Sequence, residues 1–320
     1  MRRLRCRIGT FALPALVCAM LLGACNAGTA TNPVANAPEV ADSAAALGAT
    51  QPKPMIYVPN LARDKVTAYD LNGKAALTIN TGMNLPFGVT VDNNGKIYVA
   101  NTVPHTGGSV TTYTRDGKET TPTIRNGIVY PLDVVVDKRG KIYVSNFNDY
   151  NSNGYVATYK VDGTRTTPTI TTGVDGPAGL AVDATGKIYV VNAFNSTVTT
   201  YKPDGTPTTP TISTGLDEPI GIAVDANGKI YIANAHGGHS DNGSVTTFTT
   251  DGKQTTPTIT AGVQDPHGVA VDSSGKIYVT NFLGPGKGGF GFISTFTADG
   301  KRTAPTIIKE IALPALLTFH

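Results

Sequence analysis

The chain has no tryptophan, and only three cysteines and four methionines stand among its 320 residues. It also lacks a CxxC pair, an HExxH segment, a Ser-His-Asp signature and a dinucleotide-binding glycine pattern. Without these motifs, the sequence gives no sign of a thiol redox centre, a zincin-type protease, a serine hydrolase triad or a Rossmann nucleotide site. Any function must come from residues that depart from the regular pattern described below.

Cysteine is scarcer still in the mature protein, because Cys6 and Cys18 lie in a predicted export signal over residues 1–24. The signal has a basic start and an apolar stretch over 11–22 that is too short to span a bilayer. Its end, Leu22-Gly23-Ala24-Cys25, resembles the lipobox of bacterial lipoproteins, which implies that Cys25 is lipidated and becomes the first mature residue. An ordinary signal peptide cut nearby is the alternative. With only Cys25 left, a disulfide within a mature monomer is excluded.

Neither sign of charge is in excess once the signal is removed. Four of the 26 basic residues are arginines of the signal, which leaves 22 against 23 acidic residues. This balance argues against a nucleic-acid partner. Residues 25–54 are rich in Ala, Thr and Pro and lack aromatic residues, so we predict a flexible tether from the lipid. Residues 55–320 are enough for one large all-β domain.

One phrase, PxGVAVDxxGKIYVxN, fills most of that domain. Its copies lie at 86–101, 177–192, 219–234 and 266–281, and a variant, PLDVVVDKRGKIYVSN, lies at 131–146. With the half-copy at 55–60, the Ile-Tyr pairs are spaced by 41, 45, 46, 42 and 47 residues. This period suits a propeller blade of four strands, which we name A to D from the axis outward. In the second unit we assign them to 88–91, 96–100, 109–114 and 119–124.

Turn and edge signals support the same register. Asn-Gly or Asp-Gly follows every C strand, as in a tight hairpin. An aspartate closes strand A three residues before a glycine, where its carboxylate can accept backbone N–H bonds. A proline in the D strands suits an outer edge that must not pair with another sheet. The aspartates are Asp92, Asp137, Asp183, Asp225 and Asp272, and the prolines are Pro122, Pro168, Pro210, Pro257 and Pro305.

The two ends of the domain hold the two halves of one more repeat. Residues 55–80 supply strands B, C and D of blade 1 but no strand A, and residues 313–320 align with 85–92. His320 stands where Asp92 stands in the second unit. We therefore predict a six-bladed β-propeller with four-stranded blades, closed by the C-terminal strand without a covalent bond.

The repeats resemble those of bacterial NHL-repeat propellers over essentially all of residues 55–320. They are related in pattern to the SMP-30/gluconolactonase group and, through Tyr278-Val279-Thr280-Asn281, to YVTN repeats. The resemblance implies the fold and leaves the activity open, because the shared residues are scaffold residues. SMP-30-like enzymes place a divalent metal on Glu, Asn and Asp at the propeller centre, but their acidic motif near the N-terminus has no match here.

Variation in length falls on the B–C loops, which share one face with the D–A connections. The longer loops lie at 102–108, 147–154, 235–243 and 282–291. Variable loops on a rigid scaffold commonly carry recognition, so we predict a ligand on this face. Aromatic residues there can stack on a sugar or grip a peptide, or can simply anchor the loops. They are Phe147, Tyr150, Phe194, Phe282 and Phe290.

Asp133 is the clearest exception on that face, since it replaces a glycine of the repeat. Near the channel mouth its carboxylate can bind a metal or act as a base, or it can cap a loop. An asparagine ends strand B in every blade and more simply satisfies loop backbone groups. If the chain binds a divalent ion, Asp133 with Asn146, Asn192 and Asn234 is the candidate set.

Histidines provide a second set of candidates on the same face: His105, His236, His239 and His267. The segment His236-Gly237-Gly238-His239 can hold zinc or another transition metal, or can be a solvated loop. His267, at the start of a strand A, suits a general base, although the sequence shows no matched carboxylate for it.

Two functions follow from these residues. The first is a lipid-anchored binding module of the bacterial envelope, on the outer-membrane or periplasmic side if the cell is Gram-negative. It would present its B–C and D–A loops to a protein, glycan or small molecule and touch the membrane only through its lipid. The alternative is a metal-dependent lactonase, hydrolase or lyase with Asp133 and His267 at the channel mouth. A purely structural envelope protein is a third possibility.

Overall fold

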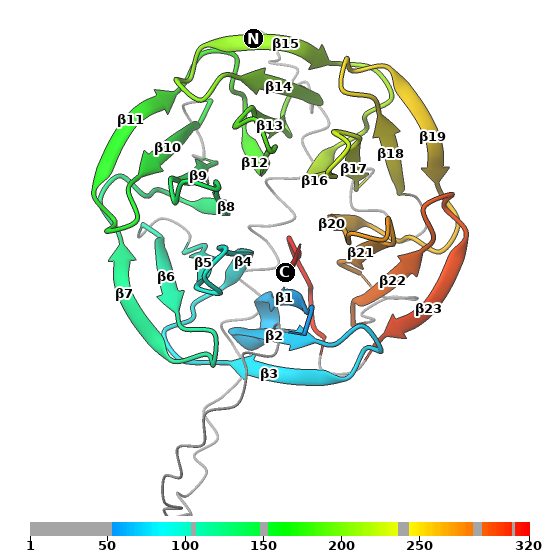
Figure 1. Ribbon diagram of the computed structural model, residues 1–320, viewed down its shortest axis with the longest axis horizontal. Helices are drawn as coiled ribbons and strands as arrows, with labels where there is room; N and C mark the ends of the chain where they lie inside the picture. The colour runs from blue at the N-terminus through cyan, green and yellow to red at the C-terminus, as the bar shows by residue number, and fades with distance from the viewer. Residues whose placement is uncertain (1–52, 104–106, 148–152, 236–242, 284–289, 309–310) are drawn as a thin grey trace, which may run out of the picture.

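The protein folds into a ring of six four-stranded antiparallel sheets around a central axis (Figure 1). This computed structural model describes residues 53–103, 107–147, 153–235, 243–283, 290–308 and 311–320. Apart from the single-turn 3-10 helix η1 (Leu61–Arg63), every regular element in those ranges is a strand. No helix there is long and apolar enough to cross a membrane. The predicted all-β, six-bladed propeller is confirmed.

Each blade contributes one strand to each of four concentric rings. The A strands are β24 (Thr318–Phe319), β4 (Pro86–Val91), β8 (Pro131–Val136), β12 (Pro177–Val182), β16 (Pro219–Val224) and β20 (Pro266–Val271). The B strands are β1 (Ile56–Asn60), β5 (Ile97–Asn101), β9 (Ile142–Asn146), β13 (Ile188–Asn192), β17 (Ile230–Asn234) and β21 (Ile277–Asn281). The C strands are β2 (Lys65–Tyr69), β6 (Ser109–Tyr113), β10 (Tyr155–Tyr159), β14 (Thr197–Tyr201), β18 (Ser244–Phe248) and β22 (Phe292–Phe296). The D strands are β3 (Ala75–Ile79), β7 (Glu119–Ile124), β11 (Arg165–Ile170), β15 (Pro207–Ile212), β19 (Gln254–Ile259) and β23 (Arg302–Ile307).

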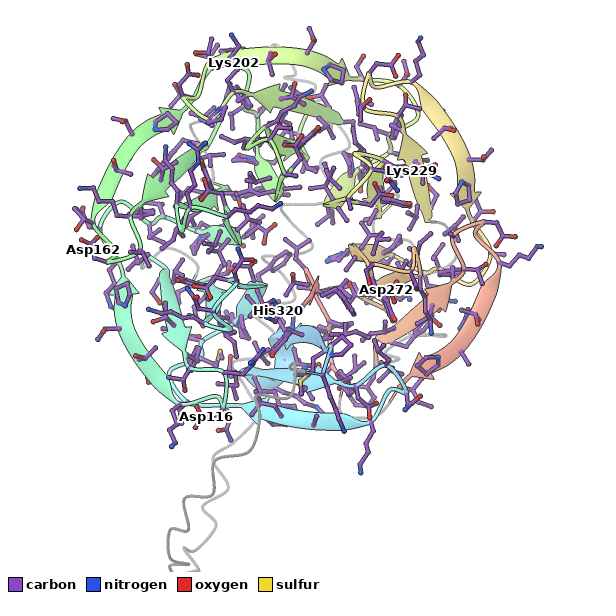
Figure 2. All side chains as sticks on the ribbon, in the orientation of Figure 1. Asp116, Asp162, Lys202, Lys229, Asp272 and His320 are labelled. Carbon is purple, nitrogen blue, oxygen red and sulfur yellow. The ribbon has the colours of Figure 1, made fainter. Side chains whose placement is uncertain are left out.

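The C-terminal segment completes blade 1, as the split repeat predicts. Strand β24 pairs antiparallel with β1, with Ile56 opposite Phe319. Backbone bonds of 2.8 and 3.0 Å join Met55 and His320, which lies near the axis in Figure 2. The pairing of β24 with β1 is shorter than the A–B pairing of the other blades. The C-terminal segment also bonds to blade 2, where the Leu316 N–H donates to the Phe87 carbonyl at 2.9 Å. Leu316 stands where four other blades have a glycine, and its side chain lines the central channel.

Burial follows the predicted order from axis to rim. The five residues of each B strand are buried, because neighbouring blades cover both faces of the sheet. This double coverage explains the unbroken Ile-Tyr-Val pattern. The D strands instead alternate between exposed and half-buried residues before a buried isoleucine. In Figure 2 the labelled C–D turn residues Asp116 and Asp162 lie at the rim.

The turn aspartates have the structural role that the sequence predicts. Asp272 Oδ1 accepts the backbone N–H groups of Ser274 at 2.9 Å and Lys276 at 3.0 Å. Its Oδ2 accepts the Tyr278 hydroxyl at 3.0 Å. Four other blades repeat this arrangement. These carboxylates therefore hold the A–B turns and are not free for ligands.

The inner strands approach one another closely enough to require glycine. A Cβ atom on Gly221 would lie 2.3 Å from the His267 carbonyl oxygen of the next blade. Beyond this constriction the A strands enclose a channel of about 230 Å³ around the axis. The channel reaches the β24 segment, whose Phe319 is among its lining residues.

Candidate functional site

We call loop face the side of the ring where A strands begin and B strands end. A buried apolar cluster, the mouth cluster, closes the axis on this face. Its members come from the first residues of A strands and the residues just after B strands. They are Leu61, Phe87, Tyr130, Leu132, Phe147, Ala178, Ala193, Ile220, Ala235, Phe282, Ala315 and Leu316. Apolar burial here joins all six blades at one point of the loop face.

The strand-end asparagines support the loop backbone next to this cluster. The side-chain oxygens of Asn146, Asn192 and Asn234 accept backbone N–H bonds from the preceding D–A connections, at 2.8, 3.0 and 3.1 Å respectively. Their amide nitrogens donate within the same blade. Asn60, Asn101 and Asn281 do the same. The interpretation that these residues satisfy loop backbone groups is confirmed.

Asp133 lies inside the channel, one position further along its strand than the mouth cluster. Its side chain is 6 % exposed. The two carboxylate oxygens accept the backbone N–H groups of Val134 and Leu180, each at 2.8 Å. Burial raises the pKa of Asp133 to about 7, although these two bonds act in the opposite direction. The carboxyl thus bridges the inner edges of β8 and β12.

The described residues offer little to a metal ion. They contain no group of three or more His, Cys, Asp or Glu side chains placed to hold one. The oxygens of Asp133 and of the three asparagines each accept a backbone N–H bond, and a metal site on these residues stays a prediction. His105, His236 and His239, like Tyr150, lie outside the described residues, and the zinc interpretation of His236 and His239 stays a prediction.

The aromatic candidates separate into packed and exposed residues. Phe147 contacts Phe194 edge-on, with ring centroids 4.8 Å apart, and Tyr130 at 5.9 Å. Phe282 is also buried in the mouth cluster. Phe290 differs, since 68 % of its surface is exposed and the Arg63 guanidinium lies 5.8 Å from its ring centroid. Three of the loop aromatics therefore build the mouth, and one remains on the surface.

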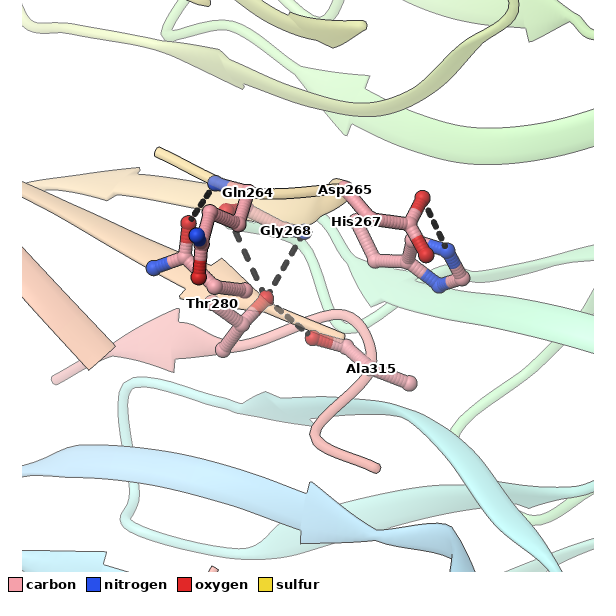
Figure 3. Close-up of polar contacts among 7 residues, drawn as sticks. Gln264, Asp265, His267, Gly268, Thr280 and Ala315 are labelled. Atoms are coloured by element: carbon pink, nitrogen blue, oxygen red, sulfur yellow. Dashed lines mark hydrogen bonds and ion pairs between the residues drawn. The ribbon is translucent and has the colours of Figure 1, made fainter. Parts of the chain in front are cut away.

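The most unusual group at the mouth is an acid and a base from blade 6. His267 occupies a position of strand A where the other blades have Phe87, Leu132, Ala178, Ile220 and Ala315. It is 4 % exposed and stacks on Phe282, with ring centroids 4.0 Å apart at an angle of 10°. Asp265, which is fully buried, places Oδ1 at 3.4 Å from His267 Nε2 (Figure 3).

Hydrogen bonds fix the backbone next to this pair. Asp265 has a left-handed φ of 45°, as has the residue before the first proline of each other blade. Its carbonyl accepts the Phe282 N–H at 3.0 Å. On the far side of His267, Thr280 Oγ1 accepts the Gly268 N–H at 2.8 Å and donates to the Ala315 carbonyl at 2.7 Å (Figure 3). These bonds hold the backbone on both sides of His267, whose imidazole stacks on Phe282.

The pair has unused hydrogen-bonding capacity. Among the described residues, neither carboxylate oxygen of Asp265 nor Nδ1 of His267 has a hydrogen-bond partner beyond the 3.4 Å ion-pair contact of Oδ1 with Nε2, and all three atoms are buried. Buried polar atoms without partners are rare in folded proteins, because each costs about 1–3 kcal/mol. Such atoms commonly meet water, an ion or a ligand. The pair is the strongest candidate site in the described part of the chain.

Sequence reasoning identified His267 but missed its carboxylate. The signal was present in the alignment of the six blades at the residue before the first proline of strand A. That position holds Leu85, Tyr130, Gly176, Glu218, Asp265 and Leu313. Only two neighbouring blades carry an acid there, and one of these acids lies two residues before the histidine.

Comparison with known proteins agrees with the repeat pattern. Residues 129–260 match the family model described as the SMP-30/gluconolactonase/LRE-like region, and residues 263–282 match the model of the NHL repeat. The chain is a six-bladed propeller, and one of its repeats matches the NHL model. The predicted resemblance is thus confirmed by these two matches, and no curated protein sequence matches this chain.

Solved structures with similar folds show how widely this architecture is used. A nidogen/laminin complex gives a TM-score of 0.67 at 17 % identity, covering 83 % of this chain and 98 % of that chain. A protein of unknown function from Bacteroides caccae gives 0.66 at 14 %, covering 84 % and 99 %. Virginiamycin B lyase from Staphylococcus aureus gives 0.57 at 15 %, covering 82 % and 83 %. At these identities the similarity concerns the fold alone.

Proposed function

We propose that this six-bladed propeller is a binding module that recognises a small ligand at the mouth on its loop face. The observation that carries the proposal is the buried Asp265–His267 pair beside the apolar mouth cluster. Apolar walls with a few convergent polar groups are the usual composition of a small-molecule site. Phe282 offers an aromatic surface, and the pair offers a carboxylate and an imidazole nitrogen. The ligand therefore combines a flat or apolar body with a hydrogen-bonding edge.

The predicted lipid on Cys25 would hold this site at the cell envelope, outside the cytoplasm. Residues 25–54 would give the propeller reach from the membrane, as a flexible Ala-, Thr- and Pro-rich segment does. The module would then collect its ligand close to the membrane surface. The fold itself is compatible with recognition of other molecules, since one similar structure is that of a nidogen/laminin complex.

The binding proposal can be tested with variants that restore the repeat. The double variant Asp265→Leu with His267→Leu removes both polar groups. Leucine already fits this fold at both positions, because other blades have Leu85 and Leu313 at the first and Leu132 at the second. We would screen sugars, aldonic lactones and short peptides for their effect on the melting temperature. A compound of the right class should raise the melting temperature of the wild type and not that of the double variant.

Two outcomes would contradict this proposal. Compounds that stabilise both proteins equally would place binding elsewhere on the propeller. If none of the three classes raises the melting temperature of the wild type, a small-ligand site at the mouth loses its support. A variant at Val161, an exposed residue on a distant turn, serves as the control that should keep the response.

The Asp265–His267 contact also favours a second function, acid–base catalysis by a hydrolase or lyase. A carboxylate beside Nε2 orients an imidazole, which leaves Nδ1 to accept a proton. In lactone hydrolysis, Nδ1 would take a proton from the attacking water. The carbonyl carbon would gain that oxygen, the ring C–O bond would break, and the released alkoxide would take the proton back. A family model whose name includes gluconolactonase matches residues 129–260 of this chain.

The catalytic hypothesis has its own experiment. Hydrolysis of D-glucono-δ-lactone would be followed with a pH indicator, with and without added divalent ions. The hypothesis predicts a rate above the spontaneous one that falls at least tenfold in His267→Gln, since general-base catalysis is worth about 10²–10⁴. A wild-type rate equal to the spontaneous rate, with or without metal, would reject the lactonase form. Metal analysis of protein purified without chelators tests the predicted divalent ion directly.

A further inference from the structure

A second candidate surface lies on blade 6, away from the channel mouth. It is a groove of about 700 Å³ between the connection that follows β19 and the outer strands β22 and β23. Its lining residues are Thr260, Gly262, Val263, Gln264, Phe290, Gly291, Phe292, Arg302, Thr306 and Ile308. Volumes of about 300–1,000 Å³ are typical of ligand-binding clefts. The groove shares no lining residue with the mouth cluster.

Two residues that depart from the repeat pattern line this groove. Phe290 stands where other B–C loops have Gly107 and Asn153, and it is 68 % exposed. Ile308 is 67 % exposed and follows a D strand, a position that holds only polar residues in the other blades. Those polar residues are Asn80, Arg125, Thr171, Ser213 and Thr260. Two large apolar side chains exposed in one cleft are a common sign of a binding surface.

Blade 6, like blade 5, lacks a hydrogen bond that closes the same region in other blades. In blades 2 and 4 a tyrosine ends strand C and its hydroxyl donates to the preceding connection, from Tyr113 to Thr81 O and from Tyr201 to Thr172 O, both at 2.7 Å. In blade 6 this residue is Phe296, which has no hydroxyl. Arg302 instead donates to the Gly262 carbonyl at 3.0 Å. The connection beside the groove is therefore held by an exposed arginine.

Among the described residues, the charged side chains at the groove are two arginines. Arg302 donates to Gly262 and to Thr306 Oγ1, which fixes its guanidinium at the groove and leaves further N–H donors free. The exposed Arg63 of η1 places its guanidinium 5.8 Å from the Phe290 ring centroid. Among the described lining residues there is no carboxylate. Such a surface is complementary to an acidic partner.

We propose that this groove docks an acidic peptide segment of a partner protein, through one large apolar side chain flanked by carboxylates. The apolar side chain packs on Phe290 and Ile308, and the carboxylates pair with Arg63 and Arg302. Exposed aromatic residues and arginines together have the composition of interface hot spots. The open form of the groove, between a connection and two outer strands, suits an extended chain. This site is independent of the Asp265–His267 pair.

The test measures fluorescence anisotropy with three labelled peptides. The first has a central phenylalanine flanked by aspartates and glutamates, the second has serine in place of the phenylalanine, and the third has lysines in place of the acids. We expect the first to bind most tightly, and more weakly as salt rises, because screening weakens pairs of exposed charges. The variant Phe290→Asn with Ile308→Thr, residues that the repeat itself uses, should bind it at least fivefold more weakly.

Control variants distinguish binding in this groove from binding at the mouth and from non-specific binding. The variant Asp265→Leu with His267→Leu should bind the acidic peptide as the wild type does, and so should Val161→Thr, which removes an exposed valine from another blade. Far-ultraviolet circular dichroism confirms that each variant is folded. The proposal is overturned if the Phe290 and Ile308 variant keeps full affinity, if the lysine peptide binds as well as the acidic one, or if the acidic peptide does not bind at millimolar concentration.

Discussion

Asp133 illustrates at the residue scale how an exception to a repeat can be structural and still have measurable consequences. The carboxyl fills a position where four blades have glycine, and it accepts one N–H bond from each of two inner strands. Burial raises the pKa of Asp133 from 3.8 to about 7. Between these two pH values the folded protein therefore keeps a proton that the unfolded chain has lost. The stability that this proton contributes is fully present below about pH 4 and is lost as the pH rises through about 7.

The variant Asp133→Gly should therefore flatten the pH dependence of unfolding. In the wild type, the free energy of unfolding should fall by up to about 1.4 kcal/mol per pH unit between these pKa values. Urea denaturation at several pH values measures this slope. The control variant is Asp162→Asn, at an exposed turn. Hydrogen bonds from Thr164 hold the pKa of the Asp162 carboxyl below its ordinary value, so this variant should leave the slope unchanged. An unchanged slope in Asp133→Gly would mean that this carboxyl is ionised throughout.

At the scale of elements, we predict that the stability of the ring depends on the closing C-terminal strand. Residues 313–320 contribute buried Ala315, Leu316 and Leu317 and pair with β1. Burying one leucine side chain contributes about 1.5–3 kcal/mol. Deleting residues 313–320 should remove several kcal/mol and lower the melting temperature by roughly 10 °C, given about 2–4 °C per kcal/mol for a domain of this size.

A peptide of residues 313–320, added to the deletion variant, should restore part of the lost melting temperature, whereas a scrambled peptide should not. Calorimetry measures both effects. Melting of the deletion variant at the wild-type temperature would show that the ring does not depend on this closure.

Elements were predictable from the sequence where a repeated pattern fixes them. The Ile-Tyr period, the Asp-Gly turns and the split repeat were enough for six blades and for the closing strand, because each signal recurs with the same physical cause. The site was less predictable. Asp265 and His267 come together through a left-handed residue before a proline, and no alternation of apolar residues encodes that bend. Asp133 was expected at the mouth, but its carboxylate turns along the channel to reach two backbone N–H groups.

The predicted anchor concerns the whole molecule. With Cys25 lipidated, the protein should sediment with membranes, because two or more acyl chains give stable attachment. The variant Cys25→Ser should shift it to the soluble fraction without changing its melting temperature, since the propeller strands begin only at Ile56. Membrane fractionation with immunoblotting, and the intact mass of the purified protein, check this outcome. A wild-type protein that is soluble and carries no lipid mass would show that an ordinary signal peptide is cut instead.

Histidine placement allows one direct test of the mouth as the recognition site. His267 lies on the loop face, stacked on Phe282 of the mouth cluster, while His320 lies at the other end of the closing strand, beside Met55. The imidazole signals of the two residues can be followed by nuclear magnetic resonance while a stabilising compound from the three classes above is added, with His267→Leu used to assign the signal. We predict that the His267 signal shifts to saturation and that the His320 signal stays in place. Saturable binding that moves His320 and leaves His267 unchanged would contradict the proposed site.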